Sequence, residues 1–419
     1  IMANNNENKV LNVPHLRFPE FNGEWEKCKI SDLLDFYSTN SLSWEQLEYD
    51  TNAMMNLHYG LIHVGLPTMI DLAKDKLPNI KEGNMPKNFE MCKEGDVAFA
   101  DASEDTNEVA KTVEFFKLAG KNVVCGLHTI HGRDNKHKTI VGFKGYAFLS
   151  AAFHNQIRRI AQGTKIYSIS TKNFSECYIG LPSKPEQTKI ATLLRLIDER
   201  IATQNKIIEK LQSLIKGLND NIHKGIKGET VCFSDLGEAY SGLSGKGGDD
   251  FGYGEPFITY MNVYQNTYIS EKDYELVQIA PNEKQNSVQY GDALFTLSSE
   301  TPEEVGIGAV YLGNTQKLYL NSFCFGIHFY DERVLPQYLA HFISSSSFRR
   351  AIYPLAQGST RFNLQKNDFM KMKFLLPSLE KQGHIANTLD ALHCRLANEK
   401  SLTEQYILLK KYLLSLMFI

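Results

Sequence analysis

The sequence predicts an α+β fold: two globular α/β domains separated by two long antiparallel helices, with one half of the chain repeating the other. Two observations predict it. The tetrapeptide AQGT at 161–164 returns as AQGS at 356–359, and LPS at 181–183 returns at 376–378, both 195 residues later. Each copy leads into a long run in which apolar residues recur every three or four positions, as in a helix. A repeat of this length is too long for a solenoid, so each half is one domain followed by one helix.

The upstream parts of the two halves also correspond. GDVAF at 95–99 matches GDALF at 291–295, and the dipeptide Ser-Glu at 103–104 matches the one at 299–300. Short apolar runs and turn residues lie between these motifs, which is typical of compact mixed domains. The expected boundaries are a disordered N-terminal tail at 1–18, a first globular domain at 19–182, a first spacer helix at 183–226, a second globular domain at 227–377 and a second spacer helix at 378–419.

The first spacer helix is predicted from a narrow apolar seam between Ile190 and Leu218 that only Gln204 interrupts. Four heptads of this pattern make a coiled-coil helix of roughly 50–60 Å. The second helix repeats the pattern from Ile385, and its phase slips near Glu399 before it resumes. A narrow seam buries itself against another helix, so we expect the two helices to form an intramolecular antiparallel coiled coil. The alternative is that each helix packs only on its own domain.

Composition places the chain among ordinary globular proteins. Of its 419 residues, 42% are hydrophobic and 22% are charged. No apolar run approaches the ~20 residues that a membrane span needs, and no signal peptide is recognisable, so we expect no membrane and a cytoplasmic location. The seven cysteines are scattered and include no C-x-x-C pair. This pattern favours free thiols over a zinc site or a disulfide framework.

Basic residues gather in corresponding parts of the two halves, although the net charge is −3. Residues 135–175 contain no Asp or Glu but seven Lys and Arg, and residues 334–367 repeat this pattern with four. One such run is most simply a solvated surface. Its recurrence at matching places favours two local nucleic-acid contacts instead.

The sequence carries no recognisable catalytic motif. It has no G-x-G-x-x-G, no phosphate-binding loop, and no Asn/Asp-Pro-Pro-aromatic loop of the kind that holds a flipped base in amino-methyltransferases. The twelve histidines have no metal-ligand spacing, so no metal site is expected. His128 and His328 occupy matching positions in the two halves by sequence, and we interpret both as structural.

The order of these motifs, repeated twice, resembles a known family. Gly-Asp-x-x-Phe, Ser-Glu-x-x-x-Glu-Val, Gln-Gly-Ser/Thr and Leu-Pro-Ser before a Gln-containing helix resemble the specificity (S) subunit of type I restriction–modification enzymes. The stretch SSETPEEVG at 298–306 is especially typical, whereas DASEDTNEV at 101–109 departs from it. The resemblance covers nearly the whole chain.

The resemblance implies a non-catalytic, sequence-specific DNA-binding subunit. Its two target-recognition domains would each read one half of a bipartite double-stranded target, with the two helices as spacer. The implied partners are two modification (M) subunits, which carry the adenine methyltransferase, and restriction (R) subunits. No cofactor is expected in this chain; S-adenosylmethionine, ATP and Mg are implied for the partners. The alternatives are the recognition subunit of a methylation-only or other restriction system of this family, or a scaffold that does not read DNA.

Candidate DNA-binding residues flank the repeated Gln-Gly turn, where Gly163 and Gly358 permit a tight bend. The alternative is that this turn only links a domain to its helix. Segments 52–76 and 241–264 differ most between the halves, as expected if they read different bases. The DNA-binding candidates are Lys144, Arg158, Arg159, Gln162, Thr164, Lys165, Arg349, Arg350, Gln357, Ser359, Arg361 and Lys366, and the partner-binding candidates are Gln187 and Gln382.

Overall fold

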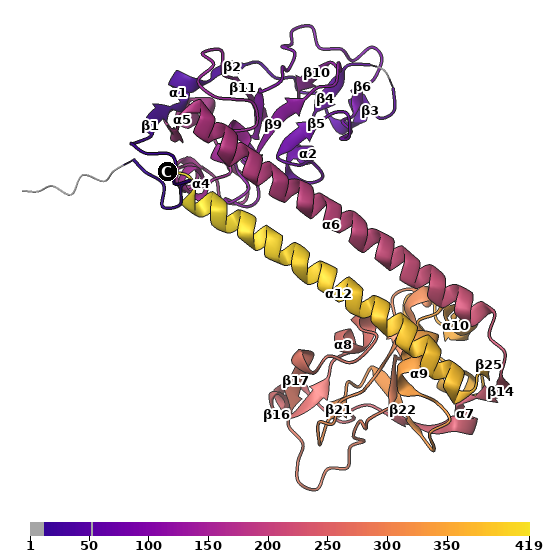
Figure 1. The fold of residues 1–419 in the computed structure, drawn as a ribbon. Coiled ribbons are helices and arrows are strands. Elements are labelled where there is room, and N and C mark those ends of the chain that lie inside the picture. Colours follow the sequence, from indigo (N-terminus) through magenta and orange to yellow (C-terminus); the bar gives the residue numbers. More distant parts are fainter. Residues whose placement is uncertain (1–11, 52) are drawn as a thin grey trace, which may run out of the picture. The chain divides into compact units, whose positions relative to one another are not determined.

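The structure, a computed structural model, describes residues 12–51 and 53–419, which form two compact units. The first unit comprises residues up to Gln204 together with Leu402–Ile419, and the second comprises Asn205–Ser401. Each unit therefore holds one globular domain, one part of the helix α6 (Lys184–Lys224) and one part of the helix α12 (Leu379–Leu416) (Figure 1). Residues 1–11 of the expected tail lie outside the described residues.

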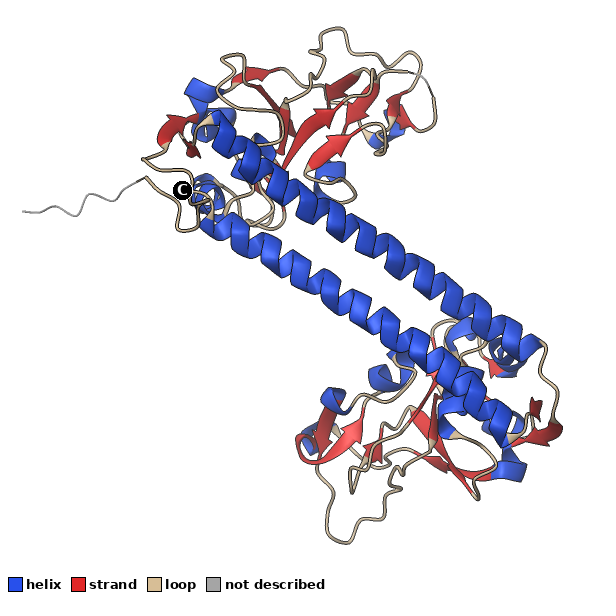
Figure 2. Cartoon of the chain, in the orientation of Figure 1, coloured by secondary structure: helices blue, strands red, loops and turns tan. Residues whose placement is uncertain are grey.

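The globular domain of the first unit combines short strands and short helices (Figure 2). In chain order its elements are β1 (Glu26–Lys29), α1 (Ile30–Leu33), β2 (Asp35–Tyr37), η1 (Trp44–Gln46), β3 (Leu47–Glu48), β4 (Met55–Leu57), α2 (Tyr59–His63), β5 (Met69–Asp71), β6 (Asn79–Ile80), β7 (Val97–Ala100), β8 (Ala102–Ser103), β9 (Thr112–Lys117), β10 (Val123–Cys125), β11 (Thr129–Arg133), α3 (Lys144–Phe148), α4 (Ala151–Ile160), β12 (Tyr167–Ser168), α5 (Thr171–Ser175) and β13 (Tyr178–Leu181).

The second unit repeats this order with fewer strands. Its elements are β14 (Glu229–Cys232), α7 (Phe233–Leu236), β15 (Gly237–Ser241), η2 (Gly248–Asp250), β16 (Phe251–Ile258), α8 (Tyr260–Gln265), η3 (Glu271–Asp273), β17 (Tyr274–Val277), β18 (Ala293–Thr296), β19 (Ser298–Ser299), η4 (Pro302–Glu304), β20 (Gly308–Val310), β21 (Tyr319–Leu320), β22 (Cys324–Phe329), α9 (Pro336–Ile343), α10 (Ser346–Ile352), η5 (Tyr353–Leu355), β23 (Ala356–Gln357), β24 (Phe362–Leu364), α11 (Lys366–Met370) and β25 (Lys373–Leu376).

Each domain contains a central antiparallel sheet of the same topology. Its order is β2-β11-β7-β9 in the first unit, where β5 adds a parallel edge strand, and β15-β22-β18-β20 in the second. The register is the same, because Ala98 faces His131 and the matching Leu294 faces Gly326. All four residues of β7 and of β18 are buried, so this sheet forms the core of each domain.

A second, outer sheet differs between the domains. It has four strands in the first unit, in the order β10-β4-β6-β3, and three in the second, in the order β17-β16-β21. One parallel pair, β4 with β10 and β16 with β21, is present in both outer sheets. Each segment that differs most in sequence contributes one strand to an outer sheet: β4 lies within 52–76 and β16 within 241–264, whereas β5 of the first segment belongs to the central sheet.

The two long helices pack side by side within each unit. In the first unit, Ile190 and Leu194 near the start of α6 share one hydrophobic core with Leu413 near the end of α12. In the second unit, Ile385 near the start of α12 shares a core with Leu218 near the end of α6. The start of each helix therefore meets the end of the other, which confirms the antiparallel arrangement. Both helices also pack on the globular domains, so the alternative was partly right.

Two details of the sequence interpretation need correction. Residues 12–18 are not a disordered tail: the Leu16 N–H donates to Leu416 O over 3.0 Å, and Arg17 forms an ion pair with Glu186. The buried stripe of α12 also does not slip out of phase, since Glu399 and Thr403 continue it, both buried. An apolar pattern cannot reveal a stripe that continues through polar side chains. In the described part of the chain, no helix is long and apolar enough to cross a membrane.

Candidate nucleic-acid interface

The repeated Gln-Gly-Thr/Ser sequence forms the tip of a hairpin in each unit. Gln162 and Ser168 exchange two backbone hydrogen bonds of 2.9 and 2.8 Å, and Gln357 pairs with Asn363. At the tip, Gly163 has φ +143° and Gly358 has φ +147°. A Cβ atom would lie 1.9 Å from Ile166 O in the first hairpin and 2.0 Å from Arg361 O in the second. Both turns therefore require glycine.

Each hairpin lies beside the recurring Ser-Glu segment. In the first unit β12 pairs with β8, so Tyr167 faces Ser103; in the second unit β24 pairs with β19, so Phe362 faces Ser299. The two motifs lie about sixty residues apart in the sequence of each half. The fold brings them together as neighbouring strands in the same way twice, so they form one surface feature in each unit.

Exposed polar and basic side chains surround the hairpin tips. The guanidinium of Arg361 lies 5.5 Å from the ring centre of Phe323, which is 52% exposed, so a cation and an aromatic face are presented together. Arg158, at the end of α4, donates to Asn107 over 2.8 Å. The sequence-predicted candidates that are exposed are Arg158, Arg159, Gln162, Thr164, Lys165, Arg350, Gln357, Ser359 and Arg361.

Two predicted DNA contacts are instead internal. Lys144 is 2% exposed and pairs with the buried Glu114 at 3.3 Å. Arg349 donates to the backbone carbonyls of Glu303, Val305 and Gly306, and so holds the loop beside the hairpin. Burial lowers the pKa of Arg349. A run of basic residues in the sequence does not show which side chains are exposed and which form contacts inside their own domain. This explains why both residues were predicted as DNA contacts.

Lys366 is an intermediate case. Its ammonium lies 5.8 Å from the ring centre of Phe325, the residue is half-buried, and burial lowers its pKa. It lies at the start of α11, just after the hairpin strand β24, so it remains near the candidate surface without being fully exposed on it.

Gln187 and Gln382, predicted as partner contacts, are buried inside their units. The Gln187 side chain accepts the Ile140 N–H and donates to the carbonyls of Lys138 and Pro182. Gln382 makes the same three bonds, accepting from Leu335 N and donating to the carbonyls of Arg333 and Pro377. Each glutamine therefore fastens a globular domain to the first turn of its long helix. We call this contact the glutamine clamp.

A buried aspartate just before the central strand β7 recurs just before β18: Asp96 in the first unit and Asp292 in the second. Asp96 accepts hydrogen bonds from Arg133, whose guanidinium lies 4.5 Å from the ring centre of Tyr37. Asp292 accepts one from Tyr240 over 2.7 Å and pairs with His328 at 2.8 Å. Strand register makes Arg133 the counterpart of His328. The sequence match of His128 with His328 was therefore wrong, and His128 instead pairs with Asp101 near the surface.

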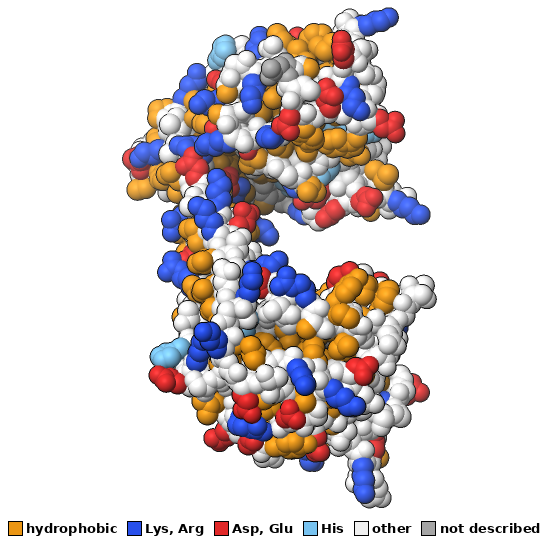
Figure 3. All heavy atoms as spheres, turned by 90° about the vertical axis from the view of Figure 1, so that its right-hand side faces the viewer, with side chains coloured by type: hydrophobic (Ala, Val, Ile, Leu, Met, Phe, Trp, Pro, Cys, Tyr) orange, Lys and Arg blue, Asp and Glu red, His pale blue; other side chains and the backbone are white. Residues whose placement is uncertain are grey.

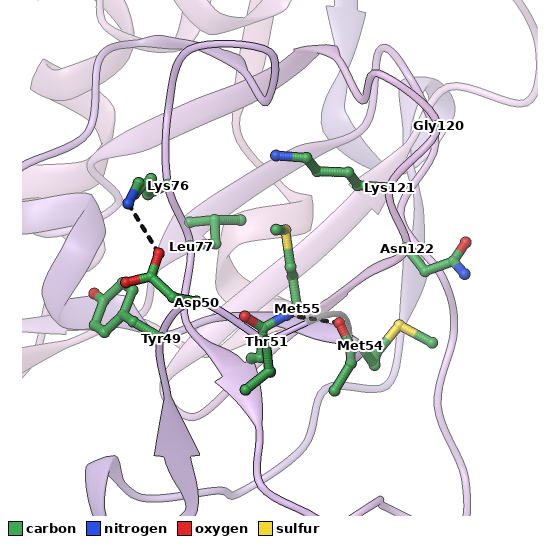
Figure 4. Close-up of a pocket in the computed structure, with 12 residues that line it drawn as sticks. Tyr49, Asp50, Thr51, Met54, Met55, Lys76, Leu77, Gly120, Lys121 and Asn122 are labelled. Atoms are coloured by element: carbon green, nitrogen blue, oxygen red, sulfur yellow. Dashed lines mark hydrogen bonds and ion pairs between the residues drawn. The ribbon is translucent and has the colours of Figure 1, made fainter.

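We call the part of each unit around its outer sheet the outer lobe. The outer lobe of the first unit contains a pocket of about 350 Å³ that the sequence did not indicate. Figure 4 shows Lys76 reaching Asp50 at this pocket, an ion pair of 2.9 Å, with Lys121 and Asn122 on the opposite wall. In the second unit the corresponding lobe exposes Tyr253, at 50%. The divergence of segments 52–76 and 241–264 could have pointed to Lys76 and Tyr253, whereas nothing in the sequence pointed to Lys121 or Asn122.

Charge is mixed on the face of the molecule that Figure 3 draws. On the face drawn in Figure 3, Lys and Arg side chains are interspersed with Asp and Glu side chains and with apolar patches. This agrees with the net charge of −3. Any contact with nucleic acid therefore depends on local groups such as the hairpin tips rather than on a field of one sign.

Comparison with known proteins decides the family. The family described as "Type I restriction modification DNA specificity domain" matches residues 117–213 and 228–405. The chain belongs to this family. It is 24% identical over 279 residues to the type I restriction enzyme EcoKI specificity subunit of Escherichia coli, an alignment that covers 60% of this chain and 58% of that relative's length.

Two solved structures have a similar fold. The S subunit of the type I restriction–modification system from M. genitalium has a TM-score of 0.54 at 14% identity, covering 97% of this chain and 99% of that one. A chain from a structure concerned with complex assembly and conformational transition of the type I R-M system has a TM-score of 0.59 at 14% identity, covering 93% and 96%. The predicted fold class and family are thereby confirmed.

Proposed function

We propose that this chain is the sequence-specific DNA-binding subunit of a type I restriction–modification complex, in which each globular domain reads one half of a bipartite double-stranded target. The observation that carries the proposal is the duplicated glycine hairpin beside the Ser-Glu strand, with exposed hydrogen-bonding and basic side chains at both tips. Membership of the specificity family agrees with it. Two equivalent sites suit a target with two halves.

The exposed side chains divide into two roles. Arginines and lysines fix the protein on the duplex through phosphates, which gives affinity but little sequence information. Of the candidates, Arg158, Arg159, Lys165, Arg350 and Arg361 take this role. Amides and hydroxyls read base edges in a groove, and the tips supply one of each per unit. The tip residues for this role are Gln162, Thr164, Gln357 and Ser359.

The outer lobes supply the difference between the two half-sites. The hairpin tips are nearly identical, so they cannot distinguish two different base sequences. Segments 52–76 and 241–264 each contribute one strand, β4 or β16, to the outer sheets, which differ in strand number. The pocket walls at Lys76, Lys121 and Asn122 in one unit and the exposed Tyr253 in the other offer different donors and stacking surfaces.

The chain acts with partner subunits and is itself non-catalytic. We place two M subunits on the exposed faces of α6 and α12, as expected from the sequence, but without Gln187 and Gln382, which are buried. These faces carry exposed apolar side chains that isolated helices seldom leave uncovered, including Leu196, Leu214, Leu408 and Tyr412. S-adenosylmethionine, ATP and Mg belong to the M and R subunits. The assembly works where the DNA is, in the cytoplasm.

A salt titration of DNA binding tests the assignment at one hairpin. In the complex with M subunits, Arg361→Ala removes one phosphate contact, so the slope of log K against log salt becomes shallower by about 1. Arg349→Ala is the matched control: it lies in the same unit but serves its own loop, so it lowers stability and leaves the slope unchanged. Equal slopes for the wild type and Arg361→Ala would contradict the assignment.

A further inference from the structure

Three metal-binding side chains meet in the interior of the first unit. Cys92, Cys125 and His131 are 5%, 2% and 0% exposed, and the ligand atoms that they offer all lie within 4.8 Å of one another. The Cys92 and Cys125 sulfurs are 3.5 Å apart. The sequence did not reveal this cluster, because its members are not arranged as a C-x-x-C pair and come together only in the fold, through the backbone bond of Cys92 to β10 and the turn from β10 to β11.

The backbone positions the three side chains independently of any ion. The Cys92 N–H donates to Val123 O over 2.8 Å, which holds Cys92 beside β10. Cys125 is the last residue of β10, and His131 lies in the middle of β11. A cluster built on two strands and a backbone-bonded neighbour is preorganised, so little conformational entropy is lost when an ion binds.

His131 is oriented as a metal ligand. Its Nε2 lies 2.7 Å from the Asp96 carboxylate, which Arg133 also holds. Its Nδ1 is buried and has no hydrogen-bond partner. A ligating histidine usually donates one ring N–H to a carboxylate and offers the other nitrogen to the metal. A fully buried imidazole nitrogen without a partner is otherwise costly, because its lost hydration is not replaced.

We propose that Cys92, Cys125 and His131 bind a zinc ion in the first target-recognition domain. Two thiolates balance the charge of Zn²⁺, and a neutral imidazole adds a third ligand. Thiolates at about 2.3 Å from one tetrahedral ion lie roughly 3.8 Å apart, close to the separation already present. Oxygen-preferring ions such as Mg²⁺ and Ca²⁺ do not suit this soft set. One coordination position stays open to water or to a further ligand.

The second unit does not repeat this cluster. Backbone pairing places Val288, Leu320 and Gly326 where the first unit has Cys92, Cys125 and His131. None of these side chains binds metal, and Cys324 is a buried thiol apart from these positions. The proposed ion therefore stabilises only one of the two domains, and it is independent of the proposed DNA contacts.

Metal analysis of the complex, prepared under reducing conditions with zinc in the growth medium, tests the site. We expect about one zinc per chain of this protein, lost in Cys92→Ser and in His131→Gln and kept in the control Cys177→Ser, another buried cysteine of the same unit. Exchange with Co²⁺ should give the absorption of cobalt–thiolate bonds, a measurement on the wild type that does not depend on the variants folding.

Chelation gives a second readout. Both tryptophans, Trp25 and Trp44, lie in the first unit, so their fluorescence follows that unit alone. Removing zinc should lower its unfolding temperature, because a structural ion contributes folding free energy. Absence of zinc together with absence of cobalt–thiolate absorption would overturn the proposal. So would a Cys92–Cys125 disulfide in the freshly prepared complex, or zinc retained by both ligand variants.

Discussion

Where a domain joins its long helix, the two units make the same three hydrogen bonds: those of Gln187 in the first and those of Gln382 in the second. Their outer sheets, in contrast, have four strands in one and three in the other. The joint must fit a helix pair that both domains share, so its geometry is restricted. The outer sheets lie away from this joint, so their strand number is free to differ. This is the pattern expected when two domains read different half-sites from one common frame.

The joints also differ in one pair of side chains. Tyr146 in the first unit donates to Asp198 on α6 over 2.8 Å. At the matching position in the second unit, His341 lies 2.8 Å from Asp390 on α12. Tyrosine does not titrate near neutral pH, whereas histidine does. The contact of this residue with a helix carboxylate therefore contains a group that titrates near neutral pH only in the second unit.

The largest expected effect comes from the apolar centre of each joint. Leu194 and Leu389 are matching positions, both 0% exposed. Replacement of either by Ala leaves a cavity and lowers the free energy of unfolding of its own unit by about 2–5 kcal/mol. Tryptophan fluorescence measures the first unit, and hydrogen exchange of α9 peptides measures the second.

The exposed Leu196 and Leu214 serve as controls on the same helix, and their replacement by Ala should change stability by less than about 0.5 kcal/mol. If Leu194→Ala destabilised the second unit as much as the first, the two joints would not be separate, and the comparison between the units would fail.

The glutamine clamp should give a smaller, equal effect in both units. Gln187→Ala and Gln382→Ala each remove the partner of one part-buried N–H, one part-buried carbonyl and one buried carbonyl, at a cost of about 1–3 kcal/mol. Urea unfolding with the same two probes measures the cost, and Gln212→Ala on an exposed face of α6 is the control. A marked inequality between the two variants would show that the clamps are not equivalent.

Acid should weaken only the joint that contains histidine. Burial lowers the pKa of His341, and Asp390 offsets this only in part. The pKa of His341 is therefore lower in the folded protein than the value of about 6.5 in the unfolded chain. Above about pH 6.5 the neutral imidazole contributes to the stability of the second unit, and this contribution is lost as the pH falls through the folded-state pKa. Burial also lowers the pKa of the neighbouring His393, so its protonation destabilises the second unit over the same pH range.

Hydrogen exchange of α9 measured at about pH 7.5 and about pH 5.5, corrected for intrinsic exchange rates, checks this pH dependence. His341→Gln should reduce the extra loss of protection at the lower pH, because one titrating group is removed. An unchanged loss in the variant would exclude His341 as its source.

The sequence predicted the repeat, the antiparallel helices and the glycine turns, because these features rest on spacing along the chain. It did not separate outward from inward polar side chains. Lys144, Arg349, Gln187 and Gln382 were all chosen for their residue type and position, and all four serve the interior of their own unit. The Cys92 cluster was missed for the same reason, since only the folded structure reveals which side chains meet.

The most direct test of the central claim is methylation mapping of a domain exchange. In the complex with M subunits, residues 227–377 are replaced by the corresponding segment of a relative with a different target, leaving both helices intact. Sequencing of the methylated sites should show that one half of the bipartite target has changed to that of the relative, while the other half is unchanged. A change in both halves, or in neither, would contradict the account.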